Sequence, residues 1–445
     1  MKTITRRTFL KHSLATVAAA SALPSINALG ANEKVVIGVM GPGGRGTLLT
    51  DKFAQRKDTA ITWVCDPDSR KLPRACGVIE KAQGQKPKTS QDFRKMLEDK
   101  NVDAIINATP DHWHCLGSIL ACQTGKDVFV EKPMSHNIFE GRKLVEAARK
   151  YKRVVQVGMQ SRSCQYLRDA MDYIRSGKLG DILVVRVFNM MQHGMRKKPA
   201  TESVPVPKEF DYDMWCGPAP MVPYDPSRRW LDRWEFSCGA IAGDAVHQID
   251  LARFLIGDIP YPDTVNHAGG VFSLTDGRDV PDTQLATFEY GKLTMLFESA
   301  LWTPYMTKTP SDKRDKGLLA NWPFNSTRIE LLGTKGFMYF GRHGDGWQAF
   351  DENAKSVVSL PGYQADKEHH DNFIACIKNR GKPAADAEQG HYSALLCHLA
   401  NISFRVGNKK LKFDGKTETF PDCADANKFI KRESYRKPWV VPDQV

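Results

Sequence analysis

The stretch that decides the fold is KVVIGVMGPGGRG, residues 34–46. Residues 35–40 are almost all apolar and rich in valine, which predicts a short buried strand. The glycine-rich turn GPGGRG follows at once, and residues 47–55 have the character of a helix. A glycine-rich turn between a strand and a helix lets the backbone approach a pyrophosphate, and the helix N-terminus supplies unpaired N–H groups. The stretch therefore predicts a dinucleotide-binding turn, whose members are Gly41, Gly43, Gly44, Arg45 and Gly46.

A second predicted strand, residues 61–65, ends at Asp66, which lies 20 residues after Gly46. A carboxylate at this spacing accepts hydrogen bonds from an adenosine ribose and repels a 2′-phosphate. The pattern predicts a Rossmann fold that binds NAD in preference to NADP. Arg70 and Lys71 follow closely and could attract a 2′-phosphate, which opposes that preference. The alternative reading is a glycine turn that binds no ligand.

Two further predicted strands end in polar residues. Residues 103–108 run into TPDHWH, and residues 127–130 run into Glu131, Lys132 and Pro133. Ligands bind at the carboxyl ends of parallel strands in doubly wound sheets, so both segments face the expected site. We expect a cofactor pocket shaped by Thr109, Pro110, Trp113, His114, Glu131 and Lys132, whereas His112 fits the pocket and the solvent equally well. A lysine before a proline is ordinarily a solvated loop charge.

These segments, and above all Glu131-Lys132-Pro133, resemble the Gfo/Idh/MocA family of NAD(P)-dependent sugar oxidoreductases. The resemblance continues in residues 156–162 (QVGMQSR) and 239–250 (GAIAGDAVHQID). Residues 214–220, 370–373 and 398–407 resemble its exported bacterial branch. The resemblance covers nearly the whole mature chain.

The resemblance implies two domains of the α/β class. The first, residues 31–158, is a Rossmann domain with a doubly wound parallel sheet. The second, residues 159–445, is an α/β domain with a large, mostly antiparallel open sheet, which forms the floor of the substrate site and often the contact of a homo-oligomer. Alternating or β-branched runs agree with this and predict strands at residues 182–188, 284–290, 293–298, 328–332 and 336–340.

The resemblance also implies a catalytic set of Lys132, His247 and Asp244. Oxidation of a secondary alcohol needs a group that takes the hydroxyl proton and stabilises the oxyanion, and Lys132 can do both. Family members commonly place the acid four residues before the histidine, but Gly243 stands there and Asp244 is three before. Both spacings share a helix face. Asp244 could instead pair with Arg162 or cap the helix, and His247 could be a core histidine.

Substrate recognition is expected from the second domain, together with Lys132 and His247. Planar aromatic rings cover the apolar face of a sugar ring, and guanidinium groups donate to its hydroxyls. The candidates are Gln160, Arg162, Trp215, Tyr224 and Arg229. The alternative for each aromatic residue is a place in the core.

A metal site is not expected. His369, His370 and Asp371 lie together, but they open a predicted amphipathic helix, where a polar cluster is ordinary. The reaction needs no metal. Ten cysteines occur without zinc spacing, and we expect most to be reduced and buried, with a disulfide left open.

The N-terminus resembles a twin-arginine export signal over residues 1–30, with Arg6 and Arg7 before an alanine-rich stretch. This predicts a periplasmic protein with no membrane span after signal removal. The formal charge of +12 falls to +8 without the signal, and no dense basic patch argues for nucleic acid. A mean hydropathy of −0.42 fits a globular chain.

Three functions remain in competition at this stage. The preferred one is NAD-dependent oxidation of a ring hydroxyl, with C3 as the expected carbon of a sugar or glycoside. The alternative is an NAD-dependent glycosidase or lyase that works by transient C3 oxidation and elimination. The third is a nucleotide-occupied binding protein without turnover.

Overall fold

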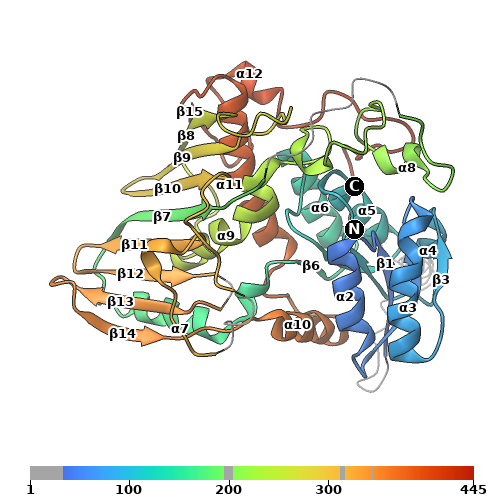
Figure 1. The fold of residues 1–445 in the computed structure, drawn as a ribbon, viewed down its shortest axis with the longest axis horizontal. Coiled ribbons are helices and arrows are strands. Elements are labelled where there is room, and N and C mark those ends of the chain that lie inside the picture. The colour runs from blue at the N-terminus through green and yellow to red at the C-terminus, as the bar shows by residue number, and fades with distance from the viewer. Residues whose placement is uncertain (1–33, 195–203, 311–315, 343) are drawn as a thin grey trace, which may run out of the picture.

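A computed structural model describes residues 34–194, 204–310, 316–342 and 344–445. These residues form two sheets, each with its own helices, and the two units pack side by side (Figure 1). The expected export signal lies outside the described residues. Within the described ranges, no helix combines the length and the apolar character needed to cross a membrane.

The first sheet is parallel and has six strands in the order β3-β2-β1-β4-β5-β6. The order reverses between β1 and β4, and this switch point is where doubly wound sheets open a ligand crevice. The strands are β1 (Val35–Met40), β2 (Thr59–Cys65), β3 (Lys88–Ser90), β4 (Ala104–Asn107), β5 (Asp127–Val130) and β6 (Val155–Val157). The helices that follow them are α2 (Gly44–Ala54), α3 (Leu72–Gln83), α4 (Arg94–Glu98), α5 (Asp111–Gln123) and α6 (Ile138–Lys150).

The second sheet has nine strands in the order β14-β13-β12-β11-β7-β10-β9-β8-β15. Its pairs are antiparallel except for β10 with β7. The strands are β7 (Ile182–Met190), β8 (Thr264–Gly270), β9 (Thr283–Tyr290), β10 (Leu293–Ala300), β11 (Arg328–Gly333), β12 (Gly336–Gly341), β13 (Trp347–Asp351), β14 (Ser356–Leu360) and β15 (Leu411–Lys412). The predicted fold class and the five predicted strands of this domain are confirmed.

Helices cover one face of the nine-stranded sheet. They are α7 (Gln165–Arg175), α9 (Val246–Leu255) and α11 (Ala387–Arg405). The short α8 (Tyr212–Cys216) and α12 (Ala424–Asn427) lie outside the sheet (Figure 1). Burial alternates along the central strands, as in β10, because successive side chains point to opposite faces.

The chain returns from the second sheet to the first. Helix α10 (Asp366–Asn379) packs Phe373 against Phe53 and Phe129 of the Rossmann domain. Further on, Trp439 is buried against Phe93 and Trp113. The Rossmann domain is therefore completed by residues that lie late in the sequence.

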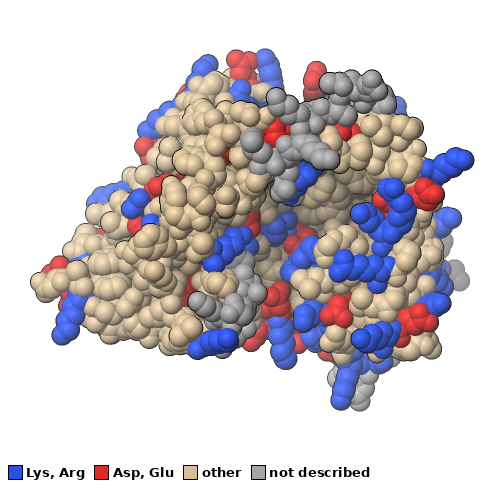
Figure 2. Space-filling view, in the orientation of Figure 1, with Lys and Arg blue, Asp and Glu red and all other residues tan. Residues whose placement is uncertain are grey.

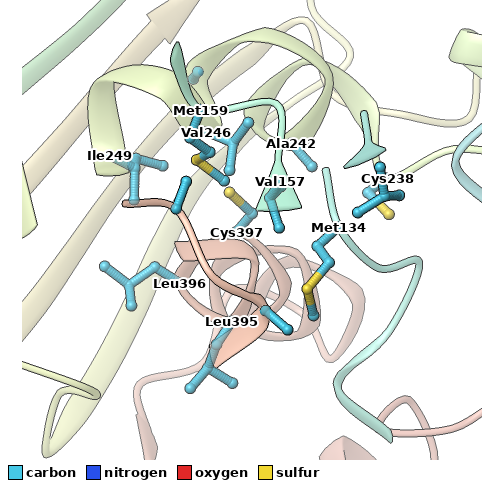
Figure 3. Close-up of a cluster of buried hydrophobic side chains, with 14 of the residues drawn as sticks. Met134, Val157, Met159, Cys238, Ala242, Val246, Ile249, Leu395, Leu396 and Cys397 are labelled. Atoms are coloured by element: carbon cyan, nitrogen blue, oxygen red, sulfur yellow. The ribbon is translucent and has the colours of Figure 1, made fainter. Parts of the chain in front are cut away.

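A buried cluster joins the two domains directly behind the loop that carries Lys132. Met134 follows that loop and Val157 ends β6, and both belong to the same buried cluster as Val246 of α9 and Leu396 of α11 (Figure 3). Close packing of this kind transmits small shifts, so the position of the Lys132 loop depends on both domains.

Candidate functional site

The glycine-rich turn needs glycine at two positions for steric reasons. Gly41 has φ +83°, and its N–H donates to the carbonyl of Cys65 at 2.9 Å. A Cβ at Gly46 would lie 2.0 Å from the Gly41 carbonyl oxygen. By contrast, a Cβ at Gly43 or Gly44 would meet nothing within 4 Å. The first pair lets the turn close on itself, and the second pair borders open space.

That open space is a cavity of about 720 Å³ that runs between the two domains. Figure 2 shows the hollow, with charged side chains gathered around it. The Rossmann wall includes Gly43, Gly44, Asp66, Thr109, Pro110, His114, Glu131 and Lys132, and the facing wall includes Phe210, Trp215, Tyr224, Trp230, Leu231 and Gly243. The donor set fits a dinucleotide: the α2 N-terminus would hold the pyrophosphate and Asp66 the adenosine ribose. We call it the dinucleotide cavity.

The neighbours of Asp66 determine its hydrogen bonding and its pKa. Its Oδ1 atom accepts from the Asp68 N–H at 2.9 Å. Burial raises the pKa of Asp66 to about 7, and the charge of Asp68 adds to the rise, while the Asp68 N–H and Lys71 oppose it. Ionisation of this carboxyl therefore falls in the physiological range.

Arg45 lines the dinucleotide cavity and is held by two carboxylates. Its Nε atom donates to Glu131 Oε1 at 2.7 Å, and an Nη atom lies 3.5 Å from Asp366 of α10. Burial would raise the pKa of Glu131, but the charges of Arg45 and Lys132 outweigh burial and lower it. Glu131 is thus an ionised anchor for Arg45.

The TPDHWH segment forms the start of α5 and is mostly buried. His114 contacts the carbonyls of Pro133 and Thr109 at 2.6 and 2.8 Å, which ties the Lys132 loop to the cofactor wall. Trp113 donates to the carbonyl of Trp215 at 2.9 Å and borders a small space behind Gly41. His112 is fully buried and is not among the described residues that line the dinucleotide cavity.

Lys132 lies where two cavities meet. It lines the dinucleotide cavity and also a second cavity of about 630 Å³, which we call the substrate cavity. Its Nζ atom donates to the Gly243 carbonyl at 2.5 Å. This carbonyl belongs to η5 (Ile241–Ala245), a π-helical turn before α9. Such turns are rare and often mark functional sites.

The carboxylate of Asp244 is hydrogen-bonded to two cationic side chains, Lys308 and Arg342, and not to Lys132. The carboxylate accepts from Lys308 at 3.0 and 3.1 Å and from Arg342 at 3.1 Å. Burial would raise the pKa of Asp244, but the charges of Arg342, Lys308 and Lys132 hold it well below its usual range. A permanently ionised carboxylate orients cations but does not relay protons near neutral pH. The suggested pairing of Asp244 with Arg162 is wrong.

His247 and Gln160 are both in the substrate cavity with Lys132. His247 is 8% exposed and lies on the first turn of α9. In the amide orientation that its neighbours require, Gln160 donates to the Gly158 carbonyl and accepts from Arg45. The structure thus brings together these two predicted residues and the predicted lysine.

Four predicted substrate residues lie elsewhere. Arg162 is buried in ion pairs with Asp250 at 2.8 Å and Asp258 at 2.6 Å, so its donors serve the fold and the expectation is corrected. Trp215 and Tyr224 line the dinucleotide cavity beside Asp66, which makes them cofactor-side residues. Arg229 is not among the described residues that line either cavity.

Sequence reasoning missed three residues of the site. Arg342 and Tyr363 line the substrate cavity, and Lys308 completes the charge cluster around Asp244. They come from the end of β12 and from two loops, and no motif surrounds them in the sequence. The only signal was Asp244 itself, three residues before the expected histidine, since a half-buried carboxylate requires cationic partners.

Structural contacts hold three further histidines, His369, His391 and His398. His369 contacts Ser163 and the Val157 carbonyl, and burial lowers its pKa to about 3. His391 and His398 are packed against Glu418 and Ser135. Among the described residues, no His, Cys, Asp and Glu side chains gather as a metal site. All ten cysteines are free thiols, and eight are buried.

The fold and these cavities define an α/β oxidoreductase with a dinucleotide domain and a separate substrate domain. The family model described as an oxidoreductase family with an NAD-binding Rossmann fold matches residues 35–159. The model for the C-terminal alpha/beta domain of the oxidoreductase family matches residues 172–412. The chain belongs to the Gfo/Idh/MocA oxidoreductase family, and its first domain is an NAD-binding domain.

The chain is similar to glycosyl hydrolases in sequence and to dehydrogenases in structure. A glycosyl hydrolase family 109 protein of Stenotrophomonas maltophilia is 36% identical over 28% of this chain and 29% of its own. A glycosyl hydrolase family 109 protein 2 of a Shewanella species is 32% identical over 40% of this chain and 44% of its own. The chain therefore matches less than half the length of these curated relatives.

Two solved structures share the fold over most of the chain. The WlbA dehydrogenase of Bordetella pertussis, in complex with NADH and UDP-GlcNAcA, has a TM-score of 0.61 and 22% identity, covering 86% of this chain and 99% of its own. A levoglucosan dehydrogenase in complex with NADH and levoglucosan has a TM-score of 0.62 and 17% identity, covering 85% and 99%.

Proposed function

We propose that this protein is an NAD-dependent oxidoreductase that acts on C3 of a sugar or glycoside, giving a keto-sugar. The observation that carries the proposal is the place of Lys132, which lines both the dinucleotide cavity and the substrate cavity. A group in that position reaches a hydroxyl on one side and the cofactor on the other. The bound nicotinamide would supply the hydride acceptor.

Lys132 acts as the proton acceptor in this proposal. In its neutral amine form Nζ would take the hydroxyl proton and become the ammonium, while the hydride of the C–H bond would pass to the bound nicotinamide and a carbonyl would form at the oxidised carbon. The Gly243 carbonyl holds Nζ at 2.5 Å and fixes its direction. His247 and Arg342 line the same cavity and can donate to the reacting oxygen or a neighbouring hydroxyl.

A carbohydrate substrate is supported by the relatives as well as by the cavity. Proteins of this fold bind UDP-GlcNAcA or levoglucosan together with NADH. The substrate cavity offers donors from Lys132, Gln160, Ser161, Arg342 and Tyr363. Such a density of polar groups suits a ring that carries several hydroxyls.

We further propose that the protein is exported by the twin-arginine route and keeps its NAD between turnovers. The second domain supports retention, because it closes over the adenosine end of the cavity. Asp211 N–H donates to the Pro67 carbonyl at 2.9 Å and Ser69 N–H donates to Glu209 at 3.0 Å. A folded protein can load NAD in the cytoplasm and carry it into a compartment without a free pool.

Retention is tested on protein purified from the periplasmic fraction. The bound nucleotide is released by acid and identified by chromatography and mass spectrometry. We expect NAD at close to one equivalent per chain. Protein that contains no nucleotide and does not bind added NAD would remove the redox proposal, and protein found only in the cytoplasm would remove the export proposal alone.

A second candidate is glycoside cleavage through transient C3 oxidation and elimination. It is favoured by the glycosyl hydrolase family 109 relatives, at 36% and 32% identity over part of the chain. Incubation with aryl glycosides separates the two. A keto-glycoside detected by mass spectrometry supports the dehydrogenase, whereas free aglycone without net reduction of NAD supports cleavage.

The open face of the nine-stranded sheet supports self-association. Outward-facing positions on the strands include Leu285, Leu296, Leu332, Phe337 and Phe350, and the last two rings stack with centroids 4.6 Å apart. Leu285 and Leu332 are 49% and 41% exposed. Extended apolar faces of this kind mark protein contacts. We propose that a second copy of the chain covers this face.

A further inference from the structure

The dinucleotide cavity carries a second acidic residue near Asp66. Asp68, Arg70 and Lys71 all line its adenosine end. An arginine beside the ribose is the group that ordinarily binds the 2′-phosphate of NADP. Its presence opposes the NAD preference that Asp66 confers, so the state of Arg70 decides how strong that preference is.

Arg70 is held by Asp68 in a two-point contact. Nε donates to Oδ1 at 2.7 Å and Nη2 donates to Oδ2 at 2.8 Å, and the backbone N–H of Arg70 also donates to Oδ1 at 3.2 Å. The Asp68 side chain is 9% exposed, and it caps η2 (Ser69–Lys71). The Nε–Nη2 edge of the guanidinium, which could grip a phosphate through two parallel N–H groups, is therefore already occupied by a carboxylate.

We propose that Asp68 is a specificity-determining residue that enforces NAD by withholding Arg70 from the 2′-phosphate. The inference rests on NAD binding by the proposed enzyme, but it concerns only the choice between two nucleotides. Asp66 and Asp68 then act differently: Asp66 accepts from the ribose and repels a phosphate, whereas Asp68 neutralises the cation that would attract one.

The chain contains a matched pair that serves as a control. Asp92 and Arg94 have the same spacing and the same two-point contact, at 2.9 and 2.7 Å, and Asp92 likewise accepts from the Arg94 N–H. Neither is among the described residues that line the dinucleotide cavity. A change there tests the turn without touching the nucleotide.

The experiment uses Asp68→Asn, which keeps an oxygen for the Arg70 N–H but removes the charge. Purified wild type, Asp68→Asn and Asp92→Asn are equilibrated with an equimolar mixture of NAD⁺ and NADP⁺ until exchange is complete. The protein-bound nucleotides are then separated from free ones and quantified. We expect the bound NADP-to-NAD ratio to rise ~10-fold or more in Asp68→Asn and to stay at the wild-type value in Asp92→Asn, since arginine–phosphate pairs are strong charge-assisted contacts.

Arg70→Gln completes the cycle in both backgrounds. In the wild-type background we expect an unchanged ratio, because Arg70 is already neutralised there. In the Asp68→Asn background we expect the gain to disappear. An unchanged ratio in Asp68→Asn, or a gain that survives Arg70→Gln, would overturn the inference. Neither result touches the proposed reaction, which fails only if no variant, the wild type included, retains any nucleotide or oxidises a glycoside.

Discussion

Lys132 is the residue on which the proposed chemistry depends. Its Nζ atom is fixed by a main-chain carbonyl, so its direction does not depend on the ionisation of a side chain. Lys132 is one of many residues that line the dinucleotide cavity, and the glycine turn and Asp66 are the ones that would hold the pyrophosphate and the ribose. Catalysis and cofactor binding should therefore separate on mutation.

For Lys132→Ala we expect turnover of the glycoside substrate to fall ~10²-fold or more, because a general acid–base group is lost. Bound NAD should remain within about twofold of wild type. Lys57→Ala is the control, since Lys57 is exposed and is not among the described residues that line either cavity. Steady-state kinetics and nucleotide content measure both effects. Unchanged turnover would remove Lys132 from the mechanism.

We expect Asp66 to make the choice between NAD and NADP depend on pH. Its pKa is raised by burial to about 7, from the ordinary value of about 3.9. Below pH 7 the carboxyl is protonated and does not repel a 2′-phosphate, and above pH 7 it is charged. We expect the preference for NAD over NADP in competition binding to rise several-fold between pH 6 and pH 8.

The 2′-phosphate also gains charge near pH 6, so the matched variant is needed to isolate Asp66. In Asp66→Asn the preference should be weaker at every pH and its rise with pH smaller. Equal slopes for the wild type and Asp66→Asn would show that the phosphate alone titrates.

The sequence predicted the position of site residues that lie within a motif, but not the contacts of residues whose partners are distant in sequence. Asp66 and Lys132 end strands of known type, so their edge of the sheet followed from topology. Arg162 also lies in a recognisable segment, yet its partners Asp250 and Asp258 are 88 and 96 residues away. Ion pairing over such distances in sequence leaves no local pattern, and this is why the substrate role of Arg162 was wrong.

At the scale of elements, the π-helical turn η5 connects the cofactor wall to the charge cluster. Gly243 presents its carbonyl to Lys132, and the next residue, Asp244, presents its carboxylate to Lys308 and Arg342. An α-helical register was assumed from the sequence, because nothing in the composition of residues 241–245 distinguishes the two kinds of turn. The strands of the second sheet, by contrast, could be predicted from the alternation of apolar and polar residues along the chain.

For Asp244→Asn we expect a loss of ~1–3 kcal/mol in unfolding free energy, because Lys308 and Arg342 lose a charged acceptor. The folded-state pKa of Asp244 lies below its unfolded value. The contribution is therefore complete above the unfolded pKa near 4 and is lost as pH falls through the lower folded pKa. Denaturant unfolding at pH 7 and at pH 3 measures this effect. The difference in unfolding free energy between the wild type and Asp244→Asn should be smaller at pH 3.

Turnover of Asp244→Asn separates the two roles suggested for this residue. A positioning role predicts a raised KM for the glycoside with kcat reduced less than ~10-fold, since Arg342 lines the substrate cavity. A proton-relay role predicts a fall in kcat of ~10²-fold or more at unchanged KM. The structure supports the first outcome.

The C-terminal segment is a second element whose position sequence patterns did not show. Trp439 is 5% exposed and packs on Trp113, with ring centroids 5.1 Å apart. For Trp439→Ala we expect the free energy of unfolding to fall by ~3–5 kcal/mol, because a large buried side chain is removed. The neighbouring Val440 is 43% exposed, so Val440→Ala should stay within about 0.5 kcal/mol of wild type. Thermal unfolding compares the two, and equal stabilities would contradict the packing.

For the whole molecule, the two faces of the nine-stranded sheet have different partners. Helices α7, α9 and α11 cover one face and enclose the core, whereas the other face shows leucine and phenylalanine between the charged pairs of Arg186 with Glu298 and Glu330. These charged side chains already pair with each other within one chain, so they need no charged partner across an apolar contact between two copies. Self-association through this face would bury it without disturbing the two cavities.

We therefore expect the protein to sediment as an oligomer at micromolar concentration. Leu285→Glu places a charge on the open face, where it cannot be desolvated without cost, and should shift the protein toward the monomer. Leu48→Glu is the matched control, because Leu48 is equally exposed at 49% but lies on α2 of the Rossmann domain. Sedimentation velocity and circular dichroism distinguish dissociation from unfolding. A wild type that is monomeric, or a Leu285→Glu variant with an unchanged sedimentation coefficient, would place the contact elsewhere and leave this face to another role.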